Sequence, residues 1–181
     1  MTIRRDTWDY LDEPETLRRR ELEYGMVREP PAPFYGHQAV VTNLVALLAP
    51  WVRARELGRI CVSPIDVVLD ADHALIVQPD AVFISTPRLG IIRDQIWGAP
   101  DLVIEVLSPG TMRRDRTRKL EWYRRYGVQE CWLVDPKRHT VDVVSLAAAD
   151  GRIARRRIRG RALVVSAVLP DLGIRASDLF E

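Results

Sequence analysis

The hydrophobic pattern of the chain changes between helix-like and strand-like stretches. From His37 to Leu57, apolar residues recur at the spacing of an amphipathic helix, and Pro50 is expected to kink that helix or to begin a new turn. After Gly58, four apolar runs have the length of β-strands: RICVSPIDVVLD, HALIVQPDAVFIS, DLVIEVL and ECWLVDP. This order predicts an α/β fold with a central mixed β-sheet flanked by helices.

The stretch between the last two runs is basic and helix-like. Its sequence, GTMRRDRTRKLEWYRRYG, predicts a helix that ends near Gly127. A strand, a helix and a second strand predict a β-α-β unit. Additional antiparallel hairpins are expected at residues 140–158, turning at Asp150–Gly151, and in EYGMVREPPAP. Residues 4–23 are expected to form a short helix, broken at Pro14.

Length and composition restrict the class of protein. A chain of 181 residues suits a single domain covering residues 1–181. No apolar run approaches the roughly 20 residues of a membrane span, and the N-terminus lacks the apolar segment of a secretory signal. The two cysteines, Cys61 and Cys131, are not clustered with histidines, which argues against a structural zinc site. We therefore expect a cytoplasmic protein without membrane contact.

The positive charge is concentrated in two segments, although the net charge is only +2. Residues 111–126 hold seven basic and two acidic side chains, and residues 152–161 hold six arginines and no acid. Such segments suit contacts with phosphates, but a solvated helix face or an exposed hairpin is the commoner explanation of a charge run.

Two carboxylates interrupt apolar runs. Glu105 lies in the middle of DLVIEVL, and Asp80 lies inside ALIVQPDAVFIS. A buried carboxylate is costly unless a cation compensates it. If the two strands are neighbours, Asp80 and Glu105 converge, and oxygen ligands of this kind suit Mg²⁺ or Mn²⁺. A structural ion pair with an arginine is the alternative.

A lysine stands near these acids in the sequence. On the helix that follows Glu105, the residues Asp115, Lys119 and Tyr123 are spaced to share one face. If Lys119 points toward the carboxylates, it can stabilise charge that develops on a phosphate. Spacing alone favours an ordinary surface pair between Asp115 and Lys119.

Several segments resemble one family. QPD at 78–80, PDLVIEVLSPGT, DRTRKLEWYRRYGVQECWLVDP and RRRELEYGMV are similar to the bacterial Uma-type family of restriction endonucleases, within the PD-(D/E)xK nuclease superfamily. The resemblance extends from about Leu17 to the tail LPDLGIRASDLF. It implies a restriction-endonuclease-like core and a Mg²⁺-dependent hydrolase that cleaves phosphodiester bonds in nucleic acid, DNA above all.

The resemblance also implies roles for particular residues. Asp80 matches the first acid of the motif and Glu105 the second, and both would be metal ligands together with the backbone carbonyl of Val106. The lysine of the ordinary motif would stand two residues after Glu105, where this chain has Leu107. Lys119 matches a lysine that has migrated to the following helix.

Further residues are implied less directly. Glu21 in RRRELEYG matches an additional acid expected on the first helix of such folds, although a surface position is an equal alternative. His37, Trp122, Tyr123 and Trp132 are more typical of helix-start or packing positions. The candidates for nucleic-acid binding are Arg113, Arg114, Arg116 and Arg118, which cannot all face one way on a helix. Such contacts bind the phosphate backbone of a nucleic acid without recognising its base sequence.

Three functions remain open on the sequence alone. The first is a metal-dependent nuclease, which as a homodimer could cut both strands of a duplex. The second is a nuclease-like binding or assembly module that no longer cuts, because Leu107 occupies the usual lysine position. The third is a structural dimerisation domain, which would bind neither metal nor nucleic acid.

Overall fold

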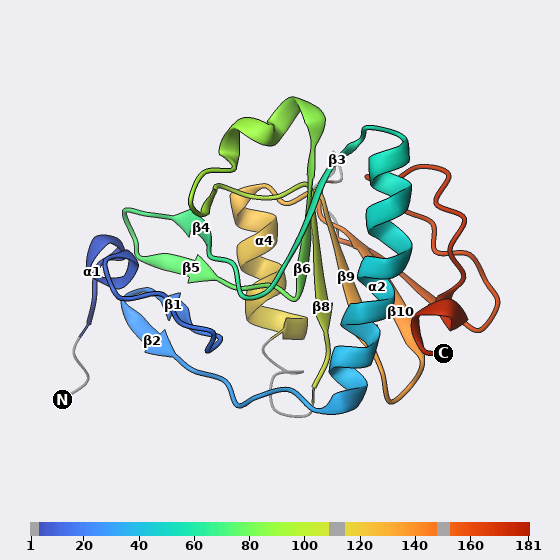
Figure 1. The fold of residues 1–181 in the computed structure, drawn as a ribbon, viewed down its shortest axis with the longest axis horizontal. Coiled ribbons are helices and arrows are strands. Elements are labelled where there is room, and N and C mark those ends of the chain that lie inside the picture. The colour runs from blue at the N-terminus through green and yellow to red at the C-terminus, as the bar shows by residue number, and fades with distance from the viewer. Residues whose placement is uncertain (1–3, 109–114, 148–152) are drawn as a thin grey trace.

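Two β-sheets form the framework of the protein in this computed structural model, which describes residues 4–108, 115–147 and 153–181 (Figure 1). The large sheet has the order β11-β10-β9-β8-β6-β3 and the small sheet the order β2-β1-β5-β4-β7. The strands of the large sheet are β3 (Gly58–Val62), β6 (Ala81–Ser85), β8 (Leu102–Val106), β9 (Glu130–Asp135), β10 (Thr140–Ser145) and β11 (Ala154–Arg159). Those of the small sheet are β1 (Glu21–Glu23), β2 (Met26–Arg28), β4 (Val67–Asp70), β5 (Leu75–Val77) and β7 (Ile96–Trp97).

Two helices cover opposite faces of the large sheet, α2 (Tyr35–Ala54) and α4 (Leu120–Tyr126), and a π-helical turn, Asp115–Lys119, directly precedes α4. The short helix α1 (Thr7–Leu11) instead packs beside the small sheet, where Tyr10 contacts the cluster of Leu22 and Ile76. Shorter 3-10 turns lie at Thr86–Ile91 and Ala176–Leu179. The predicted mixed α/β architecture is therefore confirmed. Among the helices in the described ranges, none is both long and apolar enough to span a membrane.

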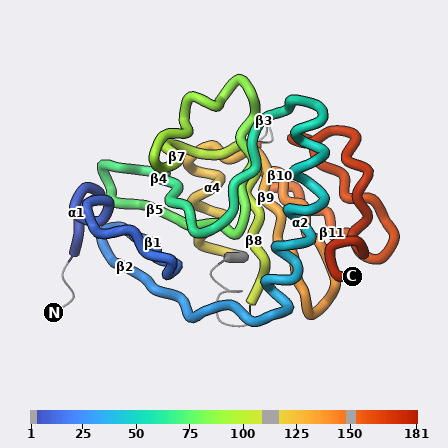
Figure 2. Tube along the Cα trace, in the orientation of Figure 1, coloured from blue at the N-terminus to red at the C-terminus, as the bar shows by residue number. Residues whose placement is uncertain are grey.

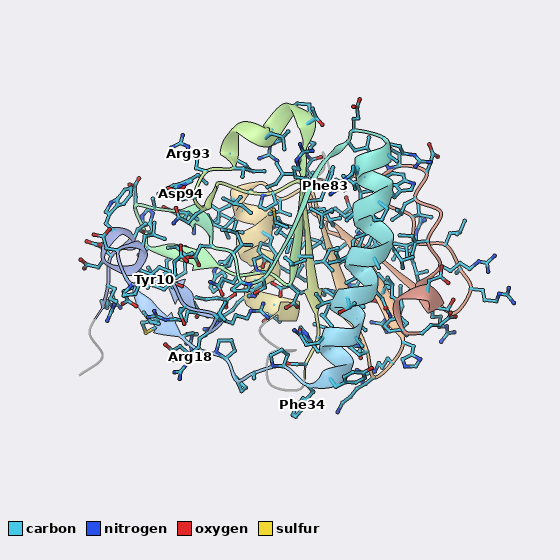
Figure 3. The ribbon with its side chains drawn as sticks, in the orientation of Figure 1. Tyr10, Arg18, Phe34, Phe83, Arg93 and Asp94 are labelled. Carbon is cyan, nitrogen blue, oxygen red and sulfur yellow. The ribbon has the colours of Figure 1, made fainter. Side chains whose placement is uncertain are left out.

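The two faces of the large sheet have separate cores. On one face, α2 packs Leu44 and Leu48 against residues of the sheet that include Phe83, which Figure 3 labels between the helix and the strands. On the other face, α4 and strands of the small sheet bury a second cluster that includes Val103 and Leu133. The alternation of side chains along β8 divides this strand between the two cores.

The predicted β-α-β unit is present. Strands β8 and β9 are parallel, with Leu102 opposite Glu130, and α4 lies in the connection between them. The predicted hairpin is also present as the antiparallel pair β10 and β11, while its predicted turn at Asp150–Gly151 lies outside the described residues.

Two strand-like runs are each divided between the two sheets, contrary to the prediction of single strands. RICVSPIDVVLD forms β3 and β4, with Pro64 between them, and HALIVQPDAVFIS forms β5 and β6, with Pro79 between them. Proline has no N–H to donate to a ladder, so neither proline continues a strand, and the chain changes sheet at each of them. Pro50, in contrast, lies within a helix that continues from Tyr35 to Ala54.

The N-terminal segment also differs from the prediction. The helix α1 ends at Leu11, and Glu21 lies in β1 rather than on a helix, in a hairpin with β2. Strand β1 also pairs with β5, so that Leu22 lies opposite Ile76. Figure 2 shows this early part of the chain beside strands from the middle of the chain. This distant pairing outweighs the weak helical pattern of a charged segment.

Candidate active site

Strand pairing brings Asp80 and Glu105 together. In the antiparallel pair β6 and β8, Ala81 lies opposite Ile104. Continuing this register by one residue places Asp80, which directly precedes β6, opposite Glu105. Only 3% of Asp80 and 1% of Glu105 is exposed. The predicted convergence of Asp80 and Glu105 depends on their strands being neighbours, and β6 and β8 are neighbours.

The position of Glu105 in β8 sets the direction of its side chain. Its neighbours on the same face, Val103 and Leu107, pack in the cluster that includes α4. The alternate residues Ile104 and Val106 pack beneath α2. Glu105 therefore points into the layer between the sheet and α4.

Lys119 and Tyr123 both bind Glu105 from that layer. Lys119 Nζ lies 2.7 Å from Glu105 Oε1, and the Tyr123 hydroxyl donates to the same oxygen at 2.5 Å. Burial, followed by the charge of Glu105, raises the pKa of Tyr123 well above its usual value, so the hydroxyl keeps its proton. Lys119 is 1% exposed and is not the surface residue that spacing favoured, while the side chain of Asp115 lies outside the described structure.

Glu21 lies on the other side of Lys119. Its Oε1 atom is 2.8 Å from Lys119 Nζ and accepts a hydrogen bond from the backbone N–H of Gln78 at 3.0 Å. Lys119 therefore joins Glu21 on the small sheet to Glu105 on the large sheet.

Asp80 is held by three donors. Arg19 NH1 donates to Asp80 Oδ1 at 2.7 Å, while the backbone N–H of Val106 donates to Oδ2 at 2.6 Å. His37 Nε2 lies 3.3 Å from the same Oδ2. Burial by itself would raise the pKa of Asp80, but the His37 hydrogen bond, the charge of Arg19 and the Val106 N–H together lower it. Burial likewise opposes protonation of His37, yet the contact with Asp80 raises the pKa of that histidine.

Arg19 bridges the two central acids. Besides its contact with Asp80, its NH2 atom lies 3.4 Å from Glu105 Oε2 and donates to the carbonyl of Gln78 at 2.5 Å. Arg19 and Asp80 line a cavity of about 470 Å³. The lining of this cavity also includes Arg18 and His37.

The donor set fits a hard divalent ion. Within the described ranges, no group of three or more His, Cys, Asp or Glu side chains converges as a metal site. Asp80 and Glu105 nevertheless share one cation, the Arg19 guanidinium, so a positive charge already occupies the position between them. Mg²⁺ characteristically uses one or two carboxylates together with water and substrate phosphate. The Val106 carbonyl points to the same side of β8 as its N–H, toward Asp80.

The arginines predicted for nucleic-acid binding are only partly described. Arg113 and Arg114 lie outside the described residues, and the side chain of Arg116 is not described. The side chain of Arg118 is 65% exposed, with NH1 3.8 Å from Glu23 Oε2.

The sequence pattern does not identify four residues of the site. It favours helix-start and packing positions for His37 and Tyr123, and it gives no role to the side chains of Arg19 and Gln78. The four-residue spacing between Lys119 and Tyr123 was a usable signal for Tyr123. Nothing in RRRELEYG distinguishes Arg19 from its neighbours, because the choice depends on how β1 docks on β5.

The sequence matches the Uma2 family, described as "Putative restriction endonuclease", over residues 8–177. The chain belongs to the Uma2 family. No curated protein matches it. Its fold is similar to the crystal structure of "a putative nuclease belonging to DUF820" from Anabaena variabilis, with a TM-score of 0.80, 23% sequence identity and coverage of 97% of both chains. The fold of this Uma2 protein is thus that of a solved relative.

Gln78 connects the site to a further acid, the half-buried Asp66. Its side chain donates to Asp66 Oδ1 at 2.9 Å and accepts from the Arg20 N–H at 3.0 Å. The Tyr10 hydroxyl, which donates to the carbonyl of Arg20 at 3.0 Å, lies 3.4 Å from Asp66. Burial raises the pKa of Asp66, outweighing the hydrogen bonds from Gln78 and Tyr10 that lower it.

Asp66→Asn is expected to stabilise the protein at neutral pH. Since the folded pKa of Asp66 lies above its unfolded value, the folded state binds more protons between the two, and stability falls as pH rises through this interval. Asparagine keeps an acceptor for Gln78 but cannot ionise. Its advantage should therefore appear as pH rises from about 4 to 7 in urea unfolding. The exposed Asp72→Asn is the control, and an advantage that instead grows toward acid pH would contradict the raised pKa of Asp66.

Proposed function

We propose that the protein is a nuclease that uses Mg²⁺ or Mn²⁺ to hydrolyse phosphodiester bonds, with DNA as the substrate. The observation that carries this proposal is the pair of buried carboxylates on adjacent strands, with a buried lysine 2.7 Å from one of them. Membership of the Uma2 family supports the same chemistry. The adjoining cavity provides access for a phosphate.

Each residue has a stated role in this proposal. Asp80 and Glu105 would hold the divalent ion, with the Val106 carbonyl as a third ligand. When bound, such an ion would polarise the phosphate and lower the pKa of the attacking water. Lys119 donates to the negative charge that develops on the phosphate, and Glu21 positions Lys119 through the 2.8 Å contact.

The lysine stands at a different place in the sequence from the lysine of the ordinary motif, but its side chain still contacts Glu105. Leu107 is buried in the cluster that includes α4, so this position contributes packing. Lys119 reaches Glu105 from the π-helical turn before α4. Such turns within helices are frequent at functional sites.

The direct test is nicking of supercoiled DNA by the full chain with Mn²⁺ or Mg²⁺, with and without EDTA. Metal-dependent conversion to open-circular and linear DNA supports the proposal. Single-stranded DNA and RNA of the same length, assayed in parallel, define the substrate class. No cleavage of any of these by protein that binds Mn²⁺ would argue against a nuclease.

A basic edge strand supports the choice of DNA. Register relations place Glu105, Leu133, Asp142 and Arg157 in one row across β8, β9, β10 and β11, on the same face of the sheet. Three strand spacings separate the ends of this row by about 14 Å, a distance that phosphates flanking the scissile one can span. Arg157 binds Asp142 through two hydrogen bonds of 2.6 and 2.9 Å.

Two further arginines of β11, Arg155 and Arg159, lie two residues from Arg157 on either side, so they share this face of the sheet, and both are exposed. Arg159→Ala is expected to weaken binding of duplex DNA at all sequences and to reduce the slope of log affinity against log salt by about 0.9. Fluorescence anisotropy from 50 to 300 mM salt measures this slope. Arg53→Ala, an exposed residue of α2 on the other face, is the matched control. Equal slopes for the two variants would exclude β11 from the DNA-binding surface.

We also propose that the protein acts as a homodimer, because two sites are needed to cut both strands of a duplex. Analytical ultracentrifugation at micromolar concentration tests this state. A monomer that only nicks would contradict it.

One observation favours a second function. The Arg19 guanidinium contacts and compensates both Asp80 and Glu105, as expected for a nuclease-like module that binds nucleic acid and no longer cuts. DNA binding by protein that binds no Mn²⁺ and cleaves nothing would favour this function over the enzyme.

A further inference from the structure

We propose that Arg19 is an internal counter-cation that competes with the divalent ion for Asp80 and Glu105. Its guanidinium bridges the two carboxylates and would leave when the ion binds. This inference rests on the function proposed above, because it concerns the same metal site.

The contacts assign one oxygen of each acid to Arg19. Asp80 Oδ2 accepts from the Val106 N–H, and Glu105 Oε1 accepts from Lys119 and Tyr123. The other oxygens, Asp80 Oδ1 and Glu105 Oε2, lie 2.7 and 3.4 Å from the two terminal nitrogens of Arg19. A metal ion that uses both of these oxygens takes the position of the guanidinium, so the two cations exclude one another.

Arg19 is placed so that it can leave without disturbing the sheets. It belongs to the irregular connection between α1 and β1, whereas Glu105 lies within β8 and Asp80 is adjacent to β6. Its side chain is 22% exposed and lines the cavity of about 470 Å³. Rotation of this side chain into the cavity, with loss of its hydrogen bond to the Gln78 carbonyl, would vacate the position.

The two buried carboxylates explain why such a counter-cation is present. Without a cation between them, both acids would lose hydration and repel one another. Arg19 relieves this penalty in the metal-free state. A divalent ion must then displace a bound cation, and its apparent affinity is reduced by the stability of the Arg19-bound state.

The test is titration of MnCl2 by calorimetry into wild type, Arg19→Ala and Arg93→Ala. Arg19→Ala is expected to bind Mn²⁺ at least about tenfold more tightly than wild type, because attraction between charges at this separation is large in a buried site. Arg93→Ala should match wild type, since Arg93 is exposed and does not line the cavity beside Asp80. Arg19→Gln provides a second variant if the alanine variant is not folded by circular dichroism.

Chemical rescue separates competition from a general change in the fold. Millimolar guanidinium chloride should weaken Mn²⁺ binding by Arg19→Ala toward the wild-type affinity, while wild type is unaffected. Urea at the same concentration is the control.

The outcomes distinguish this inference from the proposed function. Tighter binding by Arg19→Ala that guanidinium reverses supports the competition. Equal Mn²⁺ affinities of wild type and Arg19→Ala overturn it and leave the metal-dependent nuclease intact. Binding of Mn²⁺ by none of the proteins overturns both.

Discussion

Asp80→Asn and Glu105→Gln are each expected to abolish metal-dependent cleavage. Either change removes one of the two carboxylates that converge on the cation position, while the amide keeps an oxygen acceptor of similar shape. Loss of a residue that only orients a metal ligand costs about 10- to 100-fold in affinity, so loss of a ligand should cost at least about 100-fold. A metal ion contributes several kcal/mol to the transition state, and nicking should fall by about 1,000-fold or more.

The measurement combines Mn²⁺ calorimetry with nicking of supercoiled DNA on the same preparations. Glu121→Gln is the matched control, since this glutamate is exposed on α4, where its partner is Arg124 at 3.0 Å. It should bind and cleave as wild type does. Retention of both properties by Glu105→Gln would exclude Glu105 as a ligand and leave it as the ion-pair partner of Lys119.

The sequence predicts the central pair of acids because the relevant signal is local. A carboxylate inside an apolar run stands out against its neighbours, and the two-residue alternation of DLVIEVL determines which residues share its face. The β-α-β connection from β8 to β9 follows from the order of a strand, a helix and a strand. Antiparallel pairing of β6 with β8 then brings Asp80 opposite Glu105.

The position of Glu21 could not be predicted in the same way. Only three residues form β1, and their sequence, ELE, has no apolar alternation that would identify a strand. Its pairing with β5 joins residues more than fifty positions apart, with Leu22 opposite Ile76. A helix propensity summed over a charged segment gives no information about such pairing.

The positions of the cations at the site could not be predicted from the sequence either. Three consecutive arginines precede Glu21, and only the docking of β1 beside β5 directs Arg19, rather than Arg18, toward Asp80. Lys119 has a surface-like neighbour four residues earlier, which made a solvent-exposed pair the simpler prediction. Its burial results from the small sheet, because Glu21 closes the layer from the opposite side.

Lys119→Met is expected to destabilise the protein and to reduce cleavage without reducing metal affinity. Lys119 Nζ lies 2.8 Å from Glu21 and 2.7 Å from Glu105, and all three residues are 1% exposed. Removing one partner of a buried ion pair costs about 3–5 kcal/mol, because the remaining charge loses its compensation. Without the donor, cleavage should fall by about 100- to 1,000-fold. Mn²⁺ affinity should not fall, since Asp80 and Glu105 are unchanged.

The controls separate charge from position. Arg118→Met removes a neighbouring positive charge from a 65% exposed side chain, and its unfolding free energy should change by no more than about 0.5 kcal/mol. In the double variant Glu21→Gln/Lys119→Met, the carboxylate of Glu21 is replaced by a neutral amide. The loss of unfolding free energy should therefore be smaller than the sum of the losses in the two single variants, by a coupling energy of about 0.5–3 kcal/mol. Urea unfolding of wild type, Arg118→Met, the two single variants Glu21→Gln and Lys119→Met, and the double variant gives both values. If Lys119→Met instead unfolds like Arg118→Met, the lysine does not lie between the two acids in solution, and the catalytic role proposed for it loses its geometric basis.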